Sequence, residues 1–243
     1  MPKEPELLFV AHATKEHPRH GGADMIELND GSIFMCKMLI HKSGLELGAG
    51  DDAPSDLVTL SSRDGGRTWS EPATIIQPEP GETAAYCPGL IRLQNGEILF
   101  RYEMYHTFVM NEPWSISSYA CFSTDECQSF SFDDKATIWS RSSHLCGSMN
   151  DLRKLSTGRI VIPTCYMEGT ALQDEGEGLA PSNTSLAGTV YSDDNGRTWS
   201  ESARTTSISP CGAAWSQDRR VKGRPAVDGD ANPAREHVPV VFR

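Results

Sequence analysis

The residues whose types could support chemistry are arginines, carboxylates and tyrosines grouped in short polar stretches. The segment from Arg101 to His106 places Arg101, Glu103 and Tyr105 at alternate positions. A planar guanidinium can hold a carboxylate through two parallel hydrogen bonds, and carboxyl groups and imidazoles can transfer protons. These residues are therefore candidates for contacts with a ligand. The alternative for Arg101 and Glu103 is a mutual ion pair on the surface, which contributes little free energy.

Other stretches carry the same residue types. The adjacent Asp51 and Asp52 could supply an acid or a base, or they could form a solvated turn. Further candidates for binding a ligand are Arg19, His20, Asp24, Asn150, Asp151 and Tyr166. The histidines and cysteines do not follow the spacing of metal sites, so we expect neither a metal nor a cofactor.

A turn motif that occurs three times indicates how these residues are positioned. It occupies residues 62–69, 123–130 and 192–199, and the first and third copies share the pattern Ser-x-Asp-x-Gly-x-Thr-Trp. Apolar residues precede each copy, which predicts a strand, a turn and a second strand. We interpret the aspartates as structural, because an Asp side chain can accept hydrogen bonds from the N–H groups of its own turn. Calcium binding is a poor alternative, because calcium needs more oxygen ligands than one such turn offers.

A second motif alternates with the first. Residues 25–35, 90–100 and 151–162 each contain a Leu-x-x-Gly turn between two short apolar runs, which predicts a β-hairpin. Each repeating unit therefore contains two hairpins, or four strands. Units of this kind are typical of β-propeller blades. We expect an all-β chain with three blades at residues 19–80, 86–140 and 146–208, which together make a partial propeller.

The order of strands in such a blade separates the loops into two groups. The Leu-x-x-Gly turns and the Ser-x-Asp turns are short and lie at one end of the antiparallel blade. The loops between the second and third strands are longer, and they lie at the other end together with the start of the first strand. Function usually sits on long loops above a rigid scaffold, so the candidate residues are expected at this second end.

The Ser-x-Asp turns, also called Asp boxes, resemble those of the sialidase (neuraminidase) superfamily of BNR-repeat proteins. The resemblance covers roughly residues 19 to 207. It implies a six-bladed propeller in which each box lies between the third and fourth strands. At about 64 residues per blade, 243 residues cover fewer than four blades. We therefore expect a truncated protein with an open arc of about three blades.

The resemblance also implies an activity. Sialidases bind the substrate carboxylate with three arginines, and they use an aspartate as acid and base and a tyrosine nucleophile polarised by a glutamate. Arg19 corresponds to the first arginine, although the usual Arg-Ile-Pro is absent, and Asp51 or Asp52 corresponds to the acid by region. The other groups come from later blades and are not identified in this sequence.

The resulting hypothesis is a sialidase-like glycoside hydrolase for terminal sialic acid or a similar acidic sugar, incomplete and inactive as this chain. One alternative is a non-catalytic propeller that binds glycan or protein. Another is a related hydrolase for neutral sugars. Convergent arginines on the loop end would favour the enzyme for acidic sugars.

Composition limits the partners. The net charge of −11 argues against nucleic acid, which needs a basic surface. No secretory signal or membrane span is visible, so no membrane contact is expected and a cytoplasmic location is favoured. We expect the seven cysteines to be reduced. The resemblance implies a glycan as the partner. Residues 1–18 form a lead-in segment. Residues 211–243 match neither motif and are expected to be disordered or frameshifted.

Overall fold

A computed structural model describes residues 11–42, 53–107, 115–141, 145–147, 152–168, 184–202 and 205–206. Side chains are described throughout these ranges except at positions 107, 115, 141, 145–147, 165–168, 184–187 and 205–206. No helix in this described part of the chain is long and apolar enough to cross a membrane.

The first two blades each contain four antiparallel strands in chain order. Blade one consists of β1 (Arg19–Glu27), β2 (Ile33–Ile40), β3 (Ser55–Ser62) and β4 (Ala73–Ile76). Blade two consists of β5 (Ala84–Arg92), β6 (Ile98–Thr107), β7 (Ser115–Ser123) and β8 (Ala136–Arg141), with a short 3-10 turn, η1 (Phe132–Asp134), before β8. A single parallel pair, Ser55 with Ala84, joins β3 to β5.

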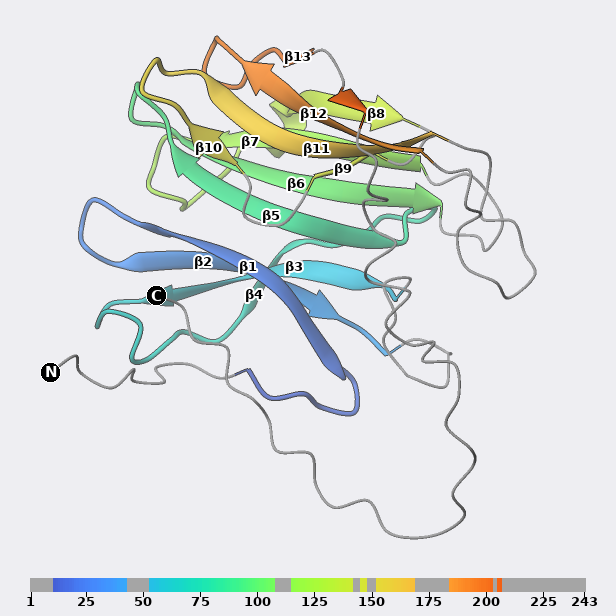
Figure 1. Ribbon diagram of the computed structural model, residues 1–243. Coiled ribbons are helices and arrows are strands. Elements are labelled where there is room, and N and C mark those ends of the chain that lie inside the picture. Colours follow the sequence, from blue (N-terminus) through green and yellow to red (C-terminus); the bar gives the residue numbers. More distant parts are fainter. Residues whose placement is uncertain are drawn as a thin grey trace, which may run out of the picture.

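Blade three has the same plan with divided outer strands. The innermost position is shared by β9 (Leu145–Gly147) and β10 (Arg153–Lys154), which both pair with β11 (Ile160–Glu168). After β12 (Thr184–Ser192), the outermost position is shared by β13 (Ser200–Glu201) and β14 (Thr205–Thr206). The three blades lie side by side as an arc (Figure 1). The predicted all-β partial propeller is confirmed.

Apolar side chains fill the space between neighbouring blades. Phe34, Cys36 and Met38 of β2 pack with Phe100 and Tyr102 of β6 in one cluster. The opposite face of β6 contributes to a second cluster, in which Leu99 packs with Ile160, Ile162 and Trp199 of blade three. Successive residues of β6 therefore point to opposite faces, as expected for a strand that is buried on both faces.

The hydrogen bonds of the Ser-x-Asp turns show the expected structural role of the aspartates. Asp64 accepts N–H bonds from Arg67 and Thr68, at 3.0 and 2.9 Å, and a hydroxyl bond from Thr68 at 2.7 Å. Asp194 makes the corresponding bonds in the third turn. The bond from the Thr68 hydroxyl is the main reason that the pKa of Asp64 is lowered to about 2.

The turns also connect one blade to the next. Glu126, in the second Ser-x-Asp turn, accepts two bonds from the Arg92 guanidinium at 2.7 and 2.8 Å and two from Asn29 of blade one, both at 2.8 Å. Arg197 of blade three contacts both carboxylate oxygens of Glu97 of blade two, at 2.9 and 2.8 Å. Each Ser-x-Asp turn of blades two and three therefore reaches the hairpin turn of the preceding blade.

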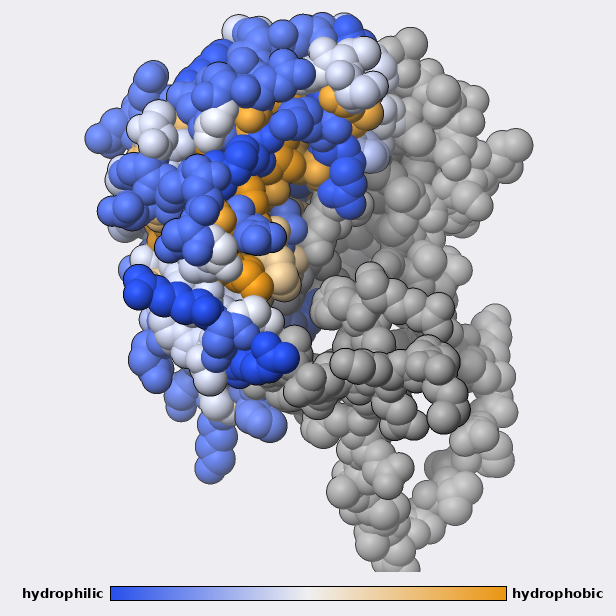
Figure 2. All heavy atoms as spheres, turned by 90° about the vertical axis from the view of Figure 1, so that its left-hand side faces the viewer, coloured by the Kyte–Doolittle hydropathy of each residue, from blue (hydrophilic) through white to orange (hydrophobic). Residues whose placement is uncertain are grey.

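The two ends of the arc differ as the strand order predicts. The hairpin turns and the Ser-x-Asp turns gather at one end, which we call the turn end (Figure 1). Figure 2 views this end, where hydrophilic residues surround an apolar band. The connections from β2 to β3, β6 to β7 and β11 to β12 leave from the opposite end, which we call the loop end.

Two groups of candidate residues expected on loops lie in strands instead. Residues 101–106 belong to β6, and Tyr166 belongs to β11. In β6 the polar residues Arg101 and Glu103 alternate with buried Tyr102 and Met104, so the strand period continues to its end. Asp24, also expected at the loop end, lies within β1 opposite Cys36.

Candidate functional site

The start of β1 carries the candidate residues of blade one. Arg19 is the first residue of the strand, is partly buried, and lies opposite Ile40, the last residue of β2. This position is at the loop end, as expected for the first arginine of a carboxylate clamp. A break in the strand register follows directly, between His20 and Ala23. A β-bulge at such a place can redirect nearby side chains toward a site.

His20 is held by two partners. Its Nδ1 lies 3.0 Å from Nζ of Lys37, and its Nε2 lies 2.9 Å from the carbonyl oxygen of His12. The ammonium of Lys37 can only donate, so Nδ1 accepts and the Nε2–H donates to His12. His20 therefore connects the segment before β1 to the first blade.

Lys37 is a residue that the sequence interpretation missed. Only 7% of its surface is exposed, and burial lowers the pKa of its amine. The available signal was a single charged residue inside the apolar run 33–40, because a lysine is rarely buried without a partner. Its contact with His20 places a cation close to the start of β1.

Asp24 has a structural environment. Its carboxylate accepts N–H bonds from Met25 at 2.9 Å and, across to blade two, from Leu90 at 2.8 Å. Burial raises the pKa of this carboxyl, while these two bonds and the charge of Arg153 oppose the rise. Asp24 thus joins the inner strands of blades one and two, away from the loop end.

Arg101 and Glu103 form an ion pair in the interior of the protein. Both have no exposed surface, and the Arg101 guanidinium pairs with the Glu103 carboxylate. The Nε–H of Arg101 lies 3.3 Å from the hydroxyl of Ser118, and its guanidinium carbon lies 5.1 Å from the centre of the Trp139 ring. The alternative of a surface ion pair is therefore wrong, because this pair is buried on the face of β6 that packs against blade three.

Tyr105 stays at the loop end. It is partly buried near the end of β6, and its ring centre lies 4.8 Å from that of Tyr86 on β5. The Tyr86 hydroxyl lies 3.4 Å from the carbonyl oxygen of Ala53. The two tyrosine rings therefore pack together near the loop end of blade two.

The remaining expected site residues lie wholly or partly outside the described residues. Asp51, Asp52, Asn150 and Asp151 lie outside the described residues. Tyr166 lies in β11, where its backbone pairs with Leu186 and Leu145, but its side chain lies outside the description. Across the part of the chain that the structure describes, no group of three or more His, Cys, Asp or Glu residues is placed to hold a metal ion.

Comparison with solved structures identifies the architecture. A Hadza microbial sialidase superposes with a TM-score of 0.56 at 15% identity, over 78% of this chain and 39% of that protein. The fold is that of the sialidase propellers. A protein of unknown function from Dyadobacter fermentans gives a TM-score of 0.59 at 20% identity, over 80% of this chain and 57% of that protein.

The same fold also occurs with another activity. An α-L-arabinofuranosidase from Fusarium graminearum, solved with an iminosugar inhibitor, gives a TM-score of 0.51 at 15% identity over 76% of this chain and 50% of that protein. No protein-family profile and no curated protein sequence matches the chain. The chain spans about two fifths of the length of the Hadza sialidase. At these identities the likeness is one of fold.

Proposed function

We propose that this chain contributes to a sialidase-like glycoside hydrolase that acts on terminal sialic acid or a similar acidic sugar at the loop end. The observation that carries the proposal is Arg19, a partly buried arginine that starts the innermost strand of a sialidase-type blade. The backbone of Arg19 is held in β1, and its guanidinium can bind a sugar carboxylate through two hydrogen bonds. A similar fold in a Hadza sialidase supports this assignment.

We further expect the 243-residue chain alone to hydrolyse such sugars slowly or not at all. Hydrolysis requires a nucleophile, an acid and a carboxylate clamp held together to within about half an ångström. Arg19 supplies one member of the clamp, and Asp51 or Asp52 is proposed as the acid. Arg101 and Glu103, which were candidates for ligand contacts, are buried and pair with each other. Binding of the sugar is therefore expected to be easier to detect than its cleavage.

A non-catalytic propeller that binds glycan is the second candidate. The burial of Arg101 and Glu103 favours it, because their charges pair with each other in the interior and are not exposed to an acidic substrate. A third candidate is hydrolysis of a neutral sugar, which the Fusarium arabinofuranosidase supports by fold.

Hydrolysis and binding assays on the same preparations separate these candidates. Hydrolysis of a fluorogenic α-sialoside and of a fluorogenic α-L-arabinofuranoside is measured with the chain and with the longest natural protein that contains it. Binding of free N-acetylneuraminic acid to the same proteins is measured by saturation-transfer NMR. Arg19→Ala is the test variant, and Arg63→Ala, an exposed arginine of the turn end, is the matched control.

The proposal expects sialic acid binding that Arg19→Ala removes and Arg63→Ala retains, with sialoside cleavage by the longer protein. Binding without cleavage by the longer protein would favour the glycan-binding module. Cleavage of the arabinofuranoside alone would replace the acidic-sugar proposal. Equal sialic acid binding by both variants would contradict the role of Arg19.

A further inference from the structure

A chain of four polar side chains crosses blade two near its loop end. A carboxylate oxygen of Glu82 lies 3.4 Å from Nδ1 of His106. Nε2 of the same imidazole lies 2.9 Å from the hydroxyl oxygen of Ser117, which lies 2.9 Å from the hydroxyl oxygen of Ser140. A carboxylate, an imidazole and a serine hydroxyl in this order form the arrangement that activates serine nucleophiles on several unrelated folds.

The strands hold three of these residues in place. The register of β6 and β7 passes from Tyr105 opposite Ile116 to Thr107 opposite Ser115, so His106 is the extra residue of a β-bulge. Ser117 lies opposite Ser140 of β8 in the next ladder, which brings the two hydroxyls together across the strands. A bulge of this kind re-aims a side chain, here over the hydroxyl of Ser117.

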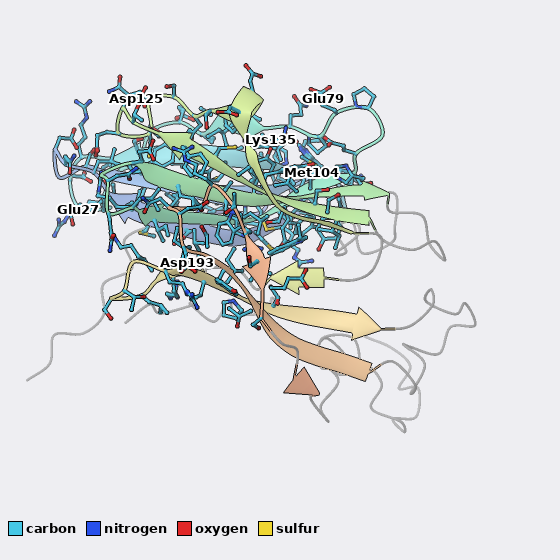
Figure 3. The ribbon with its side chains drawn as sticks, turned by 90° about the horizontal axis from the view of Figure 1, so that it is seen from above. Glu27, Glu79, Met104, Asp125, Lys135 and Asp193 are labelled. Carbon is cyan, nitrogen blue, oxygen red and sulfur yellow. The ribbon has the colours of Figure 1, made fainter. Side chains whose placement is uncertain are left out.

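Glu82 is held by a turn before β5. The N–H of Glu79 donates to one carboxylate oxygen of Glu82 at 2.8 Å, and the N–H of Glu82 donates to the carbonyl oxygen of Glu79 at the same distance. The adjacent N–H of Thr83 donates to the carbonyl oxygen of Tyr105 at 2.7 Å, which fixes this turn against β6. The oxygen of Glu82 that faces His106 is the other one. Figure 3 shows Glu79 and Met104 at the opposite end of the molecule from Asp125.

Exposure differs along the chain of contacts. Ser117 is buried, with 2% of its surface exposed, whereas Ser140 is exposed at the other side of the hydroxyl pair. Glu82 and His106 are both partly buried, with 22% and 29% of their side chains exposed. The Ser117 hydroxyl donates to that of Ser140, and both O–H groups can rotate. With the Ser140 O–H turned toward Ser117 and the Ser117 O–H turned toward Nε2 of His106, a proton could pass from the surface to the partly buried imidazole.

We propose that Glu82, His106 and Ser117 form a proton relay that activates the hydroxyl of Ser140 as a nucleophile toward acyl esters. This site crosses blade two from the turn before β5 to β8 and is separate from Arg19. It is independent of the proposed glycosidase activity.

The reaction keeps its atoms and charges in balance. The Ser140 oxygen bonds to the ester carbonyl carbon as its proton moves to Ser117 and the proton of Ser117 moves to Nε2 of His106. The carbon–oxygen bond to the alcohol then breaks, and the alcohol leaves with the proton returned through the same relay. Water hydrolyses the acyl-serine in the same way and releases the acid. Glu82 orients the imidazole and stabilises its charged form.

A fluorophosphonate probe tests the nucleophile without requiring turnover. The full chain is incubated with the probe, and the modified residue is located by fragmentation that separates Ser140 from Ser142 and Ser143. The variants are Ser140→Ala, Ser117→Ala and His106→Gln. The matched control is Ser61→Ala, which changes an exposed strand serine of blade one. Circular dichroism verifies that each variant is folded.

The expected result is stoichiometric modification of Ser140, unchanged in Ser61→Ala and absent in Ser140→Ala. Removal of the imidazole in His106→Gln should slow the reaction about 100-fold, the usual contribution of a general base. Ser117→Ala should slow it as well, because the hydroxyl that joins Ser140 to the imidazole is lost.

Glu82→Gln should reduce the rate, because the imidazole loses the carboxylate that orients it. Modification of Ser140 no faster than that of Ser61 would overturn the proposal. An equal rate in folded His106→Gln would also overturn it and leave a structural hydrogen-bond network.

Discussion

Replacing Glu126 tests how neighbouring blades are joined. Its carboxylate accepts four hydrogen bonds, two from Arg92 of blade two and two from Asn29 of blade one. These contacts lower the pKa of Glu126, mainly through the bond from the Arg92 side chain. The Arg92 and Glu126 side chains are 27% and 31% exposed, so their ion pair contributes about 1 kcal/mol. The bonds from Asn29 add about 1 kcal/mol, since each is shared with solvent.

The backbone of Glu126 supplies a second, opposite contribution. Its φ of 57° lies in the left-handed region, where a residue with a side chain is strained by about 1–2 kcal/mol. Glu126→Ala loses the contacts and keeps this strain, so it should lower the free energy of unfolding by about 2 kcal/mol. Glu126→Gly loses the same contacts but relieves the strain. Glycine also gives the unfolded chain more conformational entropy, which offsets part of this gain. Glu126→Gly should therefore be more stable than Glu126→Ala by about 0.5–1 kcal/mol.

Urea unfolding followed by tryptophan fluorescence measures both differences. Glu27→Ala, an exposed glutamate of the same end, is the control and should change the free energy of unfolding by less than about 0.5 kcal/mol. A loss below about 0.5 kcal/mol in Glu126→Ala would show that the blades are not joined here. A glycine variant less stable than the alanine variant would refute the assignment of backbone strain.

Three further predictions concern the turns and the core. Hydrogen bonds in the turns lower the pKa of Asp64 from 3.8 to about 2 and also lower that of Asp125. Their contribution to the free energy of unfolding is therefore fully present above pH 4 and should be lost as the pH falls from 4 toward 2. In acid unfolding, Asp64→Asn should make the free energy of unfolding depend less on pH over this range. Gly196→Ala should cost about 2 kcal/mol more than Gly31→Ala in thermal unfolding, because both have positive φ but only Gly196 would place a Cβ 2.4 Å from Leu99. Burial raises the pKa of the Cys121 thiol to about 12 and also raises that of Cys36, so a thiol reagent at pH 8 should modify both far more slowly in folded protein than in urea; equal rates would contradict their burial.

Short-range patterns predicted most of the fold. The Ser-x-Asp turns and the Leu-x-x-Gly hairpins depend on contacts within eight residues, such as Thr68 with Asp64, and their chemistry is visible in the chain. The end of β6 was missed because Arg101 and Glu103 are polar residues of a kind that is usually exposed. Their burial depends on packing against blade three, which no local pattern describes.

The candidate site was predicted less completely. Arg19 was proposed because the family resemblance implies an arginine at the start of the first inner strand, and the structure places Arg19 there, at the loop end. The contact between His20 and Lys37 spans 17 residues, and that between Glu82 and His106 spans 24, and both require the strand register. The register break at His106 is a further feature that the sequence pattern does not show.

Amide chemical-shift mapping with N-acetylneuraminic acid tests most directly whether the loop end binds an acidic sugar. Our account predicts concentration-dependent shifts at Arg19 and its neighbours, absent in a folded Arg19→Ala variant. It predicts no shifts at the turns around Asp64 and Asp194, which lie at the other end. Shifts confined to the turn end, or no shifts at millimolar sugar with the protein folded, would contradict the account.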